Sequence, residues 1–184
     1  MFYTHLNLKF NPIIANFKFP TLESATESPF QYRPRDWIAD NGDVHWSIWK
    51  YSVSEILSDK LLQWIAMSEL TPAHCLLFHA PARSTLVTHL DGGGIHAWAL
   101  NWAIGGNIKM SWYETIEPPT KERAYRTEEI IKEHDNTLLG DPSIVKIGVP
   151  HGAFNASASS AWILSLRFKT NIPYDQAVLQ LSSL

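Results

Sequence analysis

The sequence contains one cysteine, no long apolar run and no excess of basic charge. Cys75 alone cannot form an internal disulfide framework or a cysteine-based zinc site. No stretch approaches the roughly 18 consecutive apolar residues of a membrane-spanning helix. The formal net charge of −3 provides no basic field for nucleic acid. Residues 1–17 lack the organisation of a secretory signal, so we expect a cytoplasmic protein without nucleic-acid or membrane partners.

Apolar residues, in contrast, make up 45% of the 184 residues and include eight Trp, which is enough for a sizeable core. A helix is predicted over 52–70, where a capping-box pattern at Ser52 and Glu55 precedes apolar residues at helical spacing. Thr71-Pro72 is expected to end this helix. A second short helix is predicted after Pro173.

Residues 74–168 have the pattern of short strands separated by glycine turns, which favours a sandwich, a jelly roll or a barrel. The polar stretch 121–137 is expected to be a loop with one helical turn, and 44–51 is expected to be a strand. The candidate core strands are HCLLFHA, STLVTHL, HAWALNWAI, NIKMSWYET, SIVKIGV and SAWILSLRF.

Two of these strands have a bulky apolar face and a smaller, more polar face, because successive strand residues point to opposite sides. The bulky faces are Trp98, Leu100, Trp102 and Ile104 in one strand, and Trp162, Leu164, Leu166 and Phe168 in the other. The smaller faces are Ala97, Ala99, Asn101 and Ala103, and Ala161, Ile163, Ser165 and Arg167. A solvated sheet would explain this pattern, but alanine is a poor solvent-facing strand residue. We expect the smaller faces to leave room for a ligand and the bulky faces to pack against the helix.

His89 and Asp91 are two residues apart at the end of a predicted strand and therefore project to the same side. His151 lies after a later predicted strand and before a glycine turn. Two histidines and one carboxylate form the facial triad that suits Fe(II) and leaves coordination positions open. The same ligands also suit Mn, Co or Ni, so the ligand types alone do not identify the metal.

Arg167 and Ser165 share the smaller face of the last predicted core strand. A buried guanidinium is costly unless it meets an anion, and its planar fork suits a carboxylate. A serine hydroxyl two residues away can add a hydrogen bond. The alternative is an arginine at a strand edge that pairs with an acidic side chain.

These residues lie in motifs that resemble those of the Fe(II)/2-oxoglutarate-dependent dioxygenases, and most closely the aspartyl/asparaginyl β-hydroxylase-like branch. The resemblance covers roughly residues 75–168, and its specificity comes from the order and spacing of the motifs. The matching segments are THLDGG (88–93), ALNWAI (99–104), SWYE (111–114), VPHGAFN (149–155) and LSLRF (164–168).

The resemblance implies a mainly β fold, a double-stranded β-helix (a cupin-like jelly roll) with one or two supporting helices. It implies His89, Asp91 and His151 as iron ligands and Arg167, with Ser165, as the site for the distal carboxylate of 2-oxoglutarate. Asn101 is assigned to the cosubstrate wall, and only one of Trp112 and Tyr113 can face the pocket. Some hydroxylases of this branch lack the carboxylate ligand, whereas this sequence has Asp91. This difference weakens the inference from the family that the substrate is peptidyl.

On this basis we expect a single domain over residues 1–184. Its expected parts are an N-terminal arm (1–50), the helix (52–70), a jelly-roll core (74–168) and a C-terminal tail (169–184). The expected activity is hydroxylation of an unidentified substrate with Fe(II), 2-oxoglutarate and O₂. The alternatives are a non-catalytic cupin-like metal- or ligand-binding module and a different cupin enzyme, such as an isomerase or a thiol dioxygenase.

The substrate itself is expected to be selected by the segments 1–50, 92–97 and 115–137. The other candidate residues receive ordinary roles: a turn for His96, packing for His79, a solvated strand end for Arg83, and surface or packing positions for His5, His45, His74 and His134.

Overall fold

The computed structural model describes residues 1–184 except 22–45, 92–95, 118–122, 126 and 170–171. The expectations for His45 and for the glycine run 92–94 lie outside the described residues. None of the described helices has the length and apolarity needed to cross a membrane.

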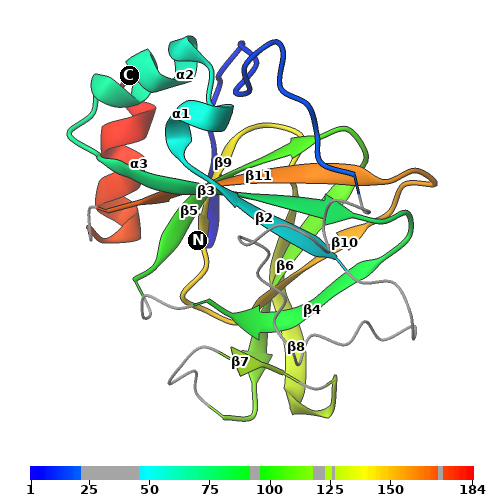
Figure 1. The fold of residues 1–184 in the computed structure, drawn as a ribbon. Coiled ribbons are helices and arrows are strands. Elements are labelled where there is room, and N and C mark those ends of the chain that lie inside the picture. The colour runs from blue at the N-terminus through cyan, green and yellow to red at the C-terminus, as the bar shows by residue number, and fades with distance from the viewer. Residues whose placement is uncertain (22–45, 92–95, 118–122, 126, 170–171) are drawn as a thin grey trace.

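Two antiparallel sheets form the body of the molecule (Figure 1). The six-stranded sheet has the order β1 (Tyr3–His5), β9 (Ser143–Lys146), β5 (Trp98–Ile104), β11 (Ala161–Phe168), β3 (Pro72–Ala80) and β2 (Ser47–Tyr51). The five-stranded sheet has the order β7 (Arg123–Ala124), β4 (Thr85–Leu90), β10 (His151–Asn155), β6 (Ile108–Thr115) and β8 (Ile130–Leu138).

The order of the strands defines the topology. The chain passes from β3 to β4, β5 and β6, changing sheet each time, and returns through the hairpin partner β8. It then changes sheet again at β9, β10 and β11, so that the last core strand pairs with the first. This arrangement is a jelly roll, and it confirms the predicted mainly β, double-stranded β-helical fold.

The bulky faces of β5 and β11 pack against the helices, as predicted. Trp98, Trp102 and Leu164 belong to one buried cluster with Leu61 and Trp64 of the helical segment, and Trp162 packs at its margin. The opposite faces of these strands look into the space between the sheets, where a second buried cluster forms around Phe78, Met110 and Trp112. The sheet therefore has helices on one side and the inter-sheet space on the other.

The helix predicted over 52–70 is instead two short helices, α1 (Val53–Ile56) and α2 (Asp59–Ala66). Leu57 is extended, with φ −81° and ψ 138°, and forms a bridge with Ile13. Ser58 then begins α2 as its N-cap, and its side chain accepts from the Leu61 N–H. The apolar spacing continues through the break because Leu57 is still buried. The second predicted helix is present as α3 (Tyr174–Ser182).

The stretch 121–137 is also different from the prediction. The expected helical turn is present as a 3₁₀ turn at Thr127–Glu129, but most of the remainder is the long strand β8. This strand is an edge strand and most of its side chains are exposed, so it shows no apolar alternation. In the N-terminal arm, the predicted strand is present as β2, and β1 was not predicted.

Candidate metal centre

Three side chains that the sequence singles out as metal ligands meet at one end of the inter-sheet space. His89 is near the end of β4, Asp91 directly follows that strand, and His151 is the first residue of β10. The sequence suggested a position between a strand and a turn for His151, but this residue lies within a strand. His151 and His89 are directly opposite in the β4–β10 pair, which brings their rings to a centroid distance of 4.3 Å.

The three side chains can approach a single cation. The His89 Nε2 lies 3.4 Å from Asp91 Oδ1, and the His151 Nε2 lies 4.0 Å from Asp91 Oδ2. One ligand atom from each residue lies within 4.8 Å of the others. Both histidines are buried, whereas the Asp91 side chain is 19% exposed, so solvent reaches the three residues at Asp91.

Hydrogen bonds to the backbone orient both imidazoles. The Nδ1 of His89 lies 2.9 Å from the carbonyl oxygen of Val87, and the Nδ1 of His151 lies 2.8 Å from that of Val149. A carbonyl can only accept, so each Nδ1 donates its proton. In the neutral ring, Nε2 then carries a lone pair that faces Asp91 and the other histidine. This is the usual outer support of a metal-binding histidine.

The electrostatics keep His151 neutral and Asp91 ionised. Burial, followed by the neighbouring His89 ring, lowers the pKa of His151 to about 3 against the opposing effect of Asp91. Burial opposes ionisation of Asp91, but the Arg167 guanidinium and the His89 ring hold the pKa of that carboxyl well below its usual range. Lone pairs on both groups are therefore available at neutral pH.

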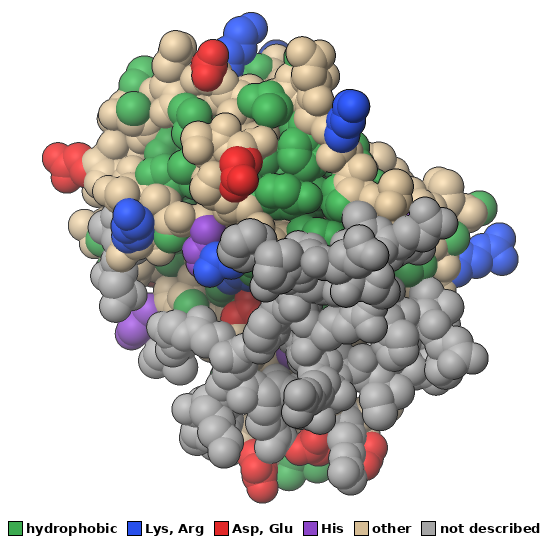
Figure 2. Space-filling model, viewed as in Figure 1, with side chains coloured by type: hydrophobic (Ala, Val, Ile, Leu, Met, Phe, Trp, Pro, Cys, Tyr) green, Lys and Arg blue, Asp and Glu red, His purple; other side chains and the backbone are tan. Residues whose placement is uncertain are grey.

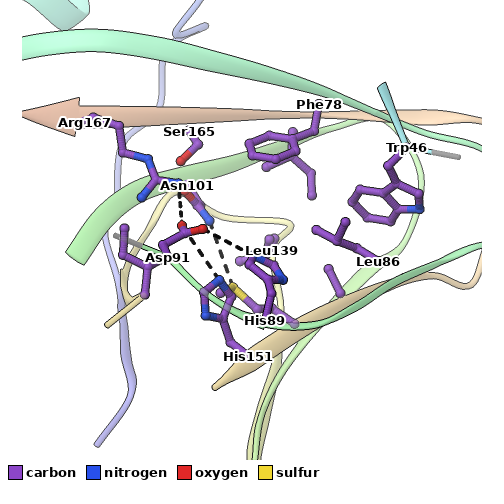
Figure 3. Close-up of a pocket in the computed structure, with 14 residues that line it drawn as sticks. Trp46, Phe78, Leu86, His89, Asp91, Asn101, Leu139, His151, Ser165 and Arg167 are labelled. Atoms are coloured by element: carbon purple, nitrogen blue, oxygen red, sulfur yellow. Dashed lines mark hydrogen bonds and ion pairs between the residues drawn. The ribbon is translucent and has the colours of Figure 1, made fainter. Parts of the chain in front are cut away.

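Arg167 extends from β11 in the other sheet and donates from Nη2 to Asp91 Oδ2 at 2.8 Å (Figure 3). Its side chain is 15% exposed and lines the cavity. A solvent-facing Arg167 would have favoured a different cupin enzyme, and this orientation is not observed. Ser165 and Asn101, which are directly opposite on β11 and β5, lie beside it.

Three polar atoms in this cavity lack a hydrogen-bond partner among the residues that the structure describes. They are the Arg167 Nε, the Ser165 Oγ and the Asn101 Oδ1, and all three are buried. Leaving a buried polar group unsatisfied costs about 1–3 kcal/mol, so such groups normally have a partner. Three together, next to a possible metal site, indicate a place for a polar ligand.

The cavity itself has one polar end and one apolar end (Figure 3). The space free of protein atoms, counted together with open solvent at the mouth, is about 380 Å³. The metal-site residues, Arg167, Ser165 and Asn101 occupy one end. The apolar lining comprises Trp46, Phe78, Leu86, Met110, Leu139, Ile147, Ala153 and Ile163.

Solved structures resemble this fold. A comparison with protein-family models and with curated proteins gives no match. A recombinant oxalate oxidase in complex with glycolate is 12% identical over 70% of this chain and 52% of its own, with a TM-score of 0.36. A Lactobacillus farciminis oxalate decarboxylase in a formate complex is 14% identical over 79% and 35%, with a TM-score of 0.39. E. coli ycfD is 12% identical over 81% and 41%, with a TM-score of 0.43.

This chain spans about a third to a half of the length of these three proteins. The assignment of the cupin-type jelly roll to this chain follows from its own strand order.

The other residues considered in the sequence have the following places. Trp112 points between the sheets and is fully buried, and its indole N–H donates to the Lys146 carbonyl, but it does not line the cavity. His79 is buried against Trp162, as expected for packing. His96 is in a turn, as expected, and Arg83 is exposed just before β4, as expected for a solvated strand end.

The apolar end of the cavity was not predicted from the sequence. Phe78 on β3 and Leu86 on β4 line this end. The inward-facing residues had been predicted for β5 and β11 alone. The same alternation in HCLLFHA separates Leu77, in the helix-side cluster, from Phe78, in the inter-sheet cluster. This alternation therefore identifies Phe78 as a residue that faces the space between the sheets.

Because the folded state resists protonation of His151 and Asp91, the metal-free protein should lose stability as the pH falls. Both pKa values are lower in the folded chain, so the unfolded chain binds more protons in acid. The contribution of His151 changes between its ordinary pKa of 6.5 and about 3. Urea unfolding with a chelator, at about pH 7 and about pH 4.5, should show a smaller loss for His151→Gln than for the original chain. An unchanged loss in His151→Gln, with His96→Gln as the exposed control, would contradict this assignment.

Proposed function

We propose that this protein is an Fe(II)- and 2-oxoglutarate-dependent oxygenase that hydroxylates an unidentified substrate. The observation that carries the proposal is the convergence of His89, Asp91 and His151 at the end of a cavity that also contains Arg167 and unsatisfied polar atoms. The donor set has two imidazoles and one carboxylate, which matches the ligand preference of Fe(II) in oxygenases.

The fit to a metal is supported by the orientation of the rings. Nδ1–H bonds to Val87 and Val149 leave both Nε2 atoms facing inward. Asp91 uses Oδ2 to accept from Arg167, while its Oδ1 faces His89. One carboxylate oxygen can therefore serve a cation while the other keeps its bond to the guanidinium.

The fit to 2-oxoglutarate is supported by the cation and the unsatisfied atoms. The Arg167 Nε and the Ser165 hydroxyl are the donors available for a carboxylate, and the Asn101 amide lies next to Ser165 on the neighbouring strand. A charge-assisted hydrogen bond from a guanidinium is worth more than a neutral one. These residues would bind and orient the cosubstrate.

The remaining cavity residues have a protective role in this proposal. When bound, iron and 2-oxoglutarate supply the oxidation of a substrate C–H bond, and no side-chain general base is required. Trp46, Phe78 and Leu86 make the inner end apolar, which limits water near the reacting centre. The Trp46 indole is fixed by its N–H bond to Ser84 at 2.7 Å, so this wall is held in one orientation.

Anaerobic titration with Fe(II) and then 2-oxoglutarate tests the proposal. We expect the weak visible charge-transfer band of the iron chelate, and succinate formation after O₂ is admitted. Absence of both would reject the oxygenase. Metal binding without 2-oxoglutarate consumption would instead favour the metal- or ligand-binding module.

A further inference from the structure

Two basic side chains, Lys50 and His74, lie on the cavity-facing side of the six-stranded sheet beside Arg167. His74 on β3 is directly opposite Arg167 on β11. Lys50 on β2 is opposite Leu76, which is in turn opposite Ser165. Directly opposed residues of antiparallel strands project to the same face. Lys50 and His74 therefore share the face of Ser165 and Arg167, at the end of the sheet near the metal ligands.

These basic groups have no acidic partner among the described residues. Within the described part of the chain, neither the Lys50 nor the His74 side chain forms an ion pair or a hydrogen bond. Burial, and then the positive charges of Lys50 and Arg167, lower the pKa of His74. Asp91 is the acidic residue of the cavity, and it is already engaged by Arg167. The local field at His74 is thus positive.

Protection of a sheet edge against association would explain Lys50, but it would not explain His74. An exposed lysine on an edge strand such as β2 commonly prevents sheet-to-sheet association. His74, however, is partly buried, and it lies next to the Arg167 of the proposed cosubstrate site. The face of the molecule that is seen in Figure 2 has a histidine, a Lys or Arg side chain and an acidic side chain close together.

Arg167 and the unsatisfied hydroxyl of Ser165 are assigned to the cosubstrate in the proposed function. Neighbouring strands are about 4.8 Å apart, so Lys50, two strands from Ser165, starts about 10 Å away. Lys50 therefore lies beyond the Arg167 position and is exposed to solvent, and His74, on the strand between β11 and β2, lies between the two. A small anion beside the cosubstrate would meet both Lys50 and His74.

We propose that the substrate to be hydroxylated is a small molecule with a carboxylate or phosphate group, which Lys50 and His74 bind beside Arg167. This inference rests on the proposed function, because it places the anionic group next to the metal and cosubstrate. Lys50 supplies a charged donor, and the His74 ring supplies an N–H donor. The substrate C–H bond would then lie between this anchor and the metal ligands.

The test uses the full chain loaded with Mn(II) and saturating 2-oxoglutarate, so that the metal and Arg167 are already occupied. Inorganic phosphate and acetate are then titrated separately by NMR and by calorimetry. We expect Lys50→Gln and His74→Gln each to weaken binding of at least one anion by roughly threefold to tenfold, because Lys50 is exposed to solvent and His74 offers a single N–H donor. Lys60→Gln, on the exposed side of α2, is the control with the same charge change.

The outcomes separate the two proposals. In one outcome, Mn(II) and 2-oxoglutarate bind, but Lys50→Gln and His74→Gln change the affinities for phosphate and acetate no more than Lys60→Gln does. The proposed anion site is then wrong, and the oxygenase assignment stands. If Mn(II) and 2-oxoglutarate do not bind the original chain, both proposals are overturned. If both variants lose affinity for one of the two anions and not for the other, the anion whose affinity falls is the one that the site binds.

Discussion

Substitution of His151 by alanine should lower the affinity for Mn(II) or Fe(II) by at least roughly 100-fold, because loss of an outer hydrogen-bonding partner alone costs about 10- to 100-fold. His151 supplies one of three ligand atoms that lie within 4.8 Å of one another. Two remaining side chains cannot hold the metal in the same geometry. Anaerobic calorimetry or competition with a metal-sensitive dye measures the affinity directly.

His151→Gln and His96→Ala are the matched variants for this experiment. His151→Gln keeps most of the buried volume of the ring, and His96 is exposed outside the cavity. We expect the metal affinity of His96→Ala to equal that of the original chain. Unchanged metal binding in both His151 variants would remove His151 from the ligand set. A large fall in melting temperature on chelation would indicate a structural metal and favour the binding module.

Substitution of Arg167 by glutamine should weaken 2-oxoglutarate binding by roughly 10- to 100-fold, because a hydrogen bond to a charged group contributes about 1.5–3 kcal/mol. Metal affinity should change by less than about tenfold. Loss of an outer hydrogen bond to Asp91 alone would cost about 10- to 100-fold, but removal of the neighbouring positive charge offsets part of that loss. Titration of 2-oxoglutarate into the Mn(II)-loaded protein separates the two effects.

Arg167→Lys should give intermediate 2-oxoglutarate affinity, because an ammonium keeps the charge but not the planar fork. Normal cosubstrate affinity in Arg167→Gln would place the carboxylate elsewhere. Loss of metal as severe as in His151→Ala would mean that Arg167 acts mainly by holding Asp91 through the 2.8 Å bond to Oδ2.

Much of the fold was predictable because face alternation survives in β5 and β11. Trp98 and Trp102 on one side and Asn101 on the other separate the helix-covered face from the inter-sheet face. The break at Leu57 was not predictable, because a buried leucine fits a helix and the bridge to Ile13 equally well. Strand β8 was missed because an edge strand needs only backbone pairing, and charged side chains suit its exposed position.

The candidate site was partly predictable for a similar reason. A His-x-Asp pair at a strand end must project to one side, and this places His89 beside Asp91. The approach of His151 depends on the pairing of β10 with β4, which spacing along the chain does not define. The bond between Arg167 and Asp91 joins the two sheets, so it could not be seen from either strand alone.

The direct opposition of His89 and His151 has a consequence for folding. A slip of one residue between β4 and β10 would turn His151 to the outer face of the sheet, because side chains alternate. A metal ion could then be held only by chains whose strands have paired correctly. A ligand that binds only the native state stabilises it by mass action. A metal ion bound at this site would therefore favour the native strand alignment over shifted alignments during folding.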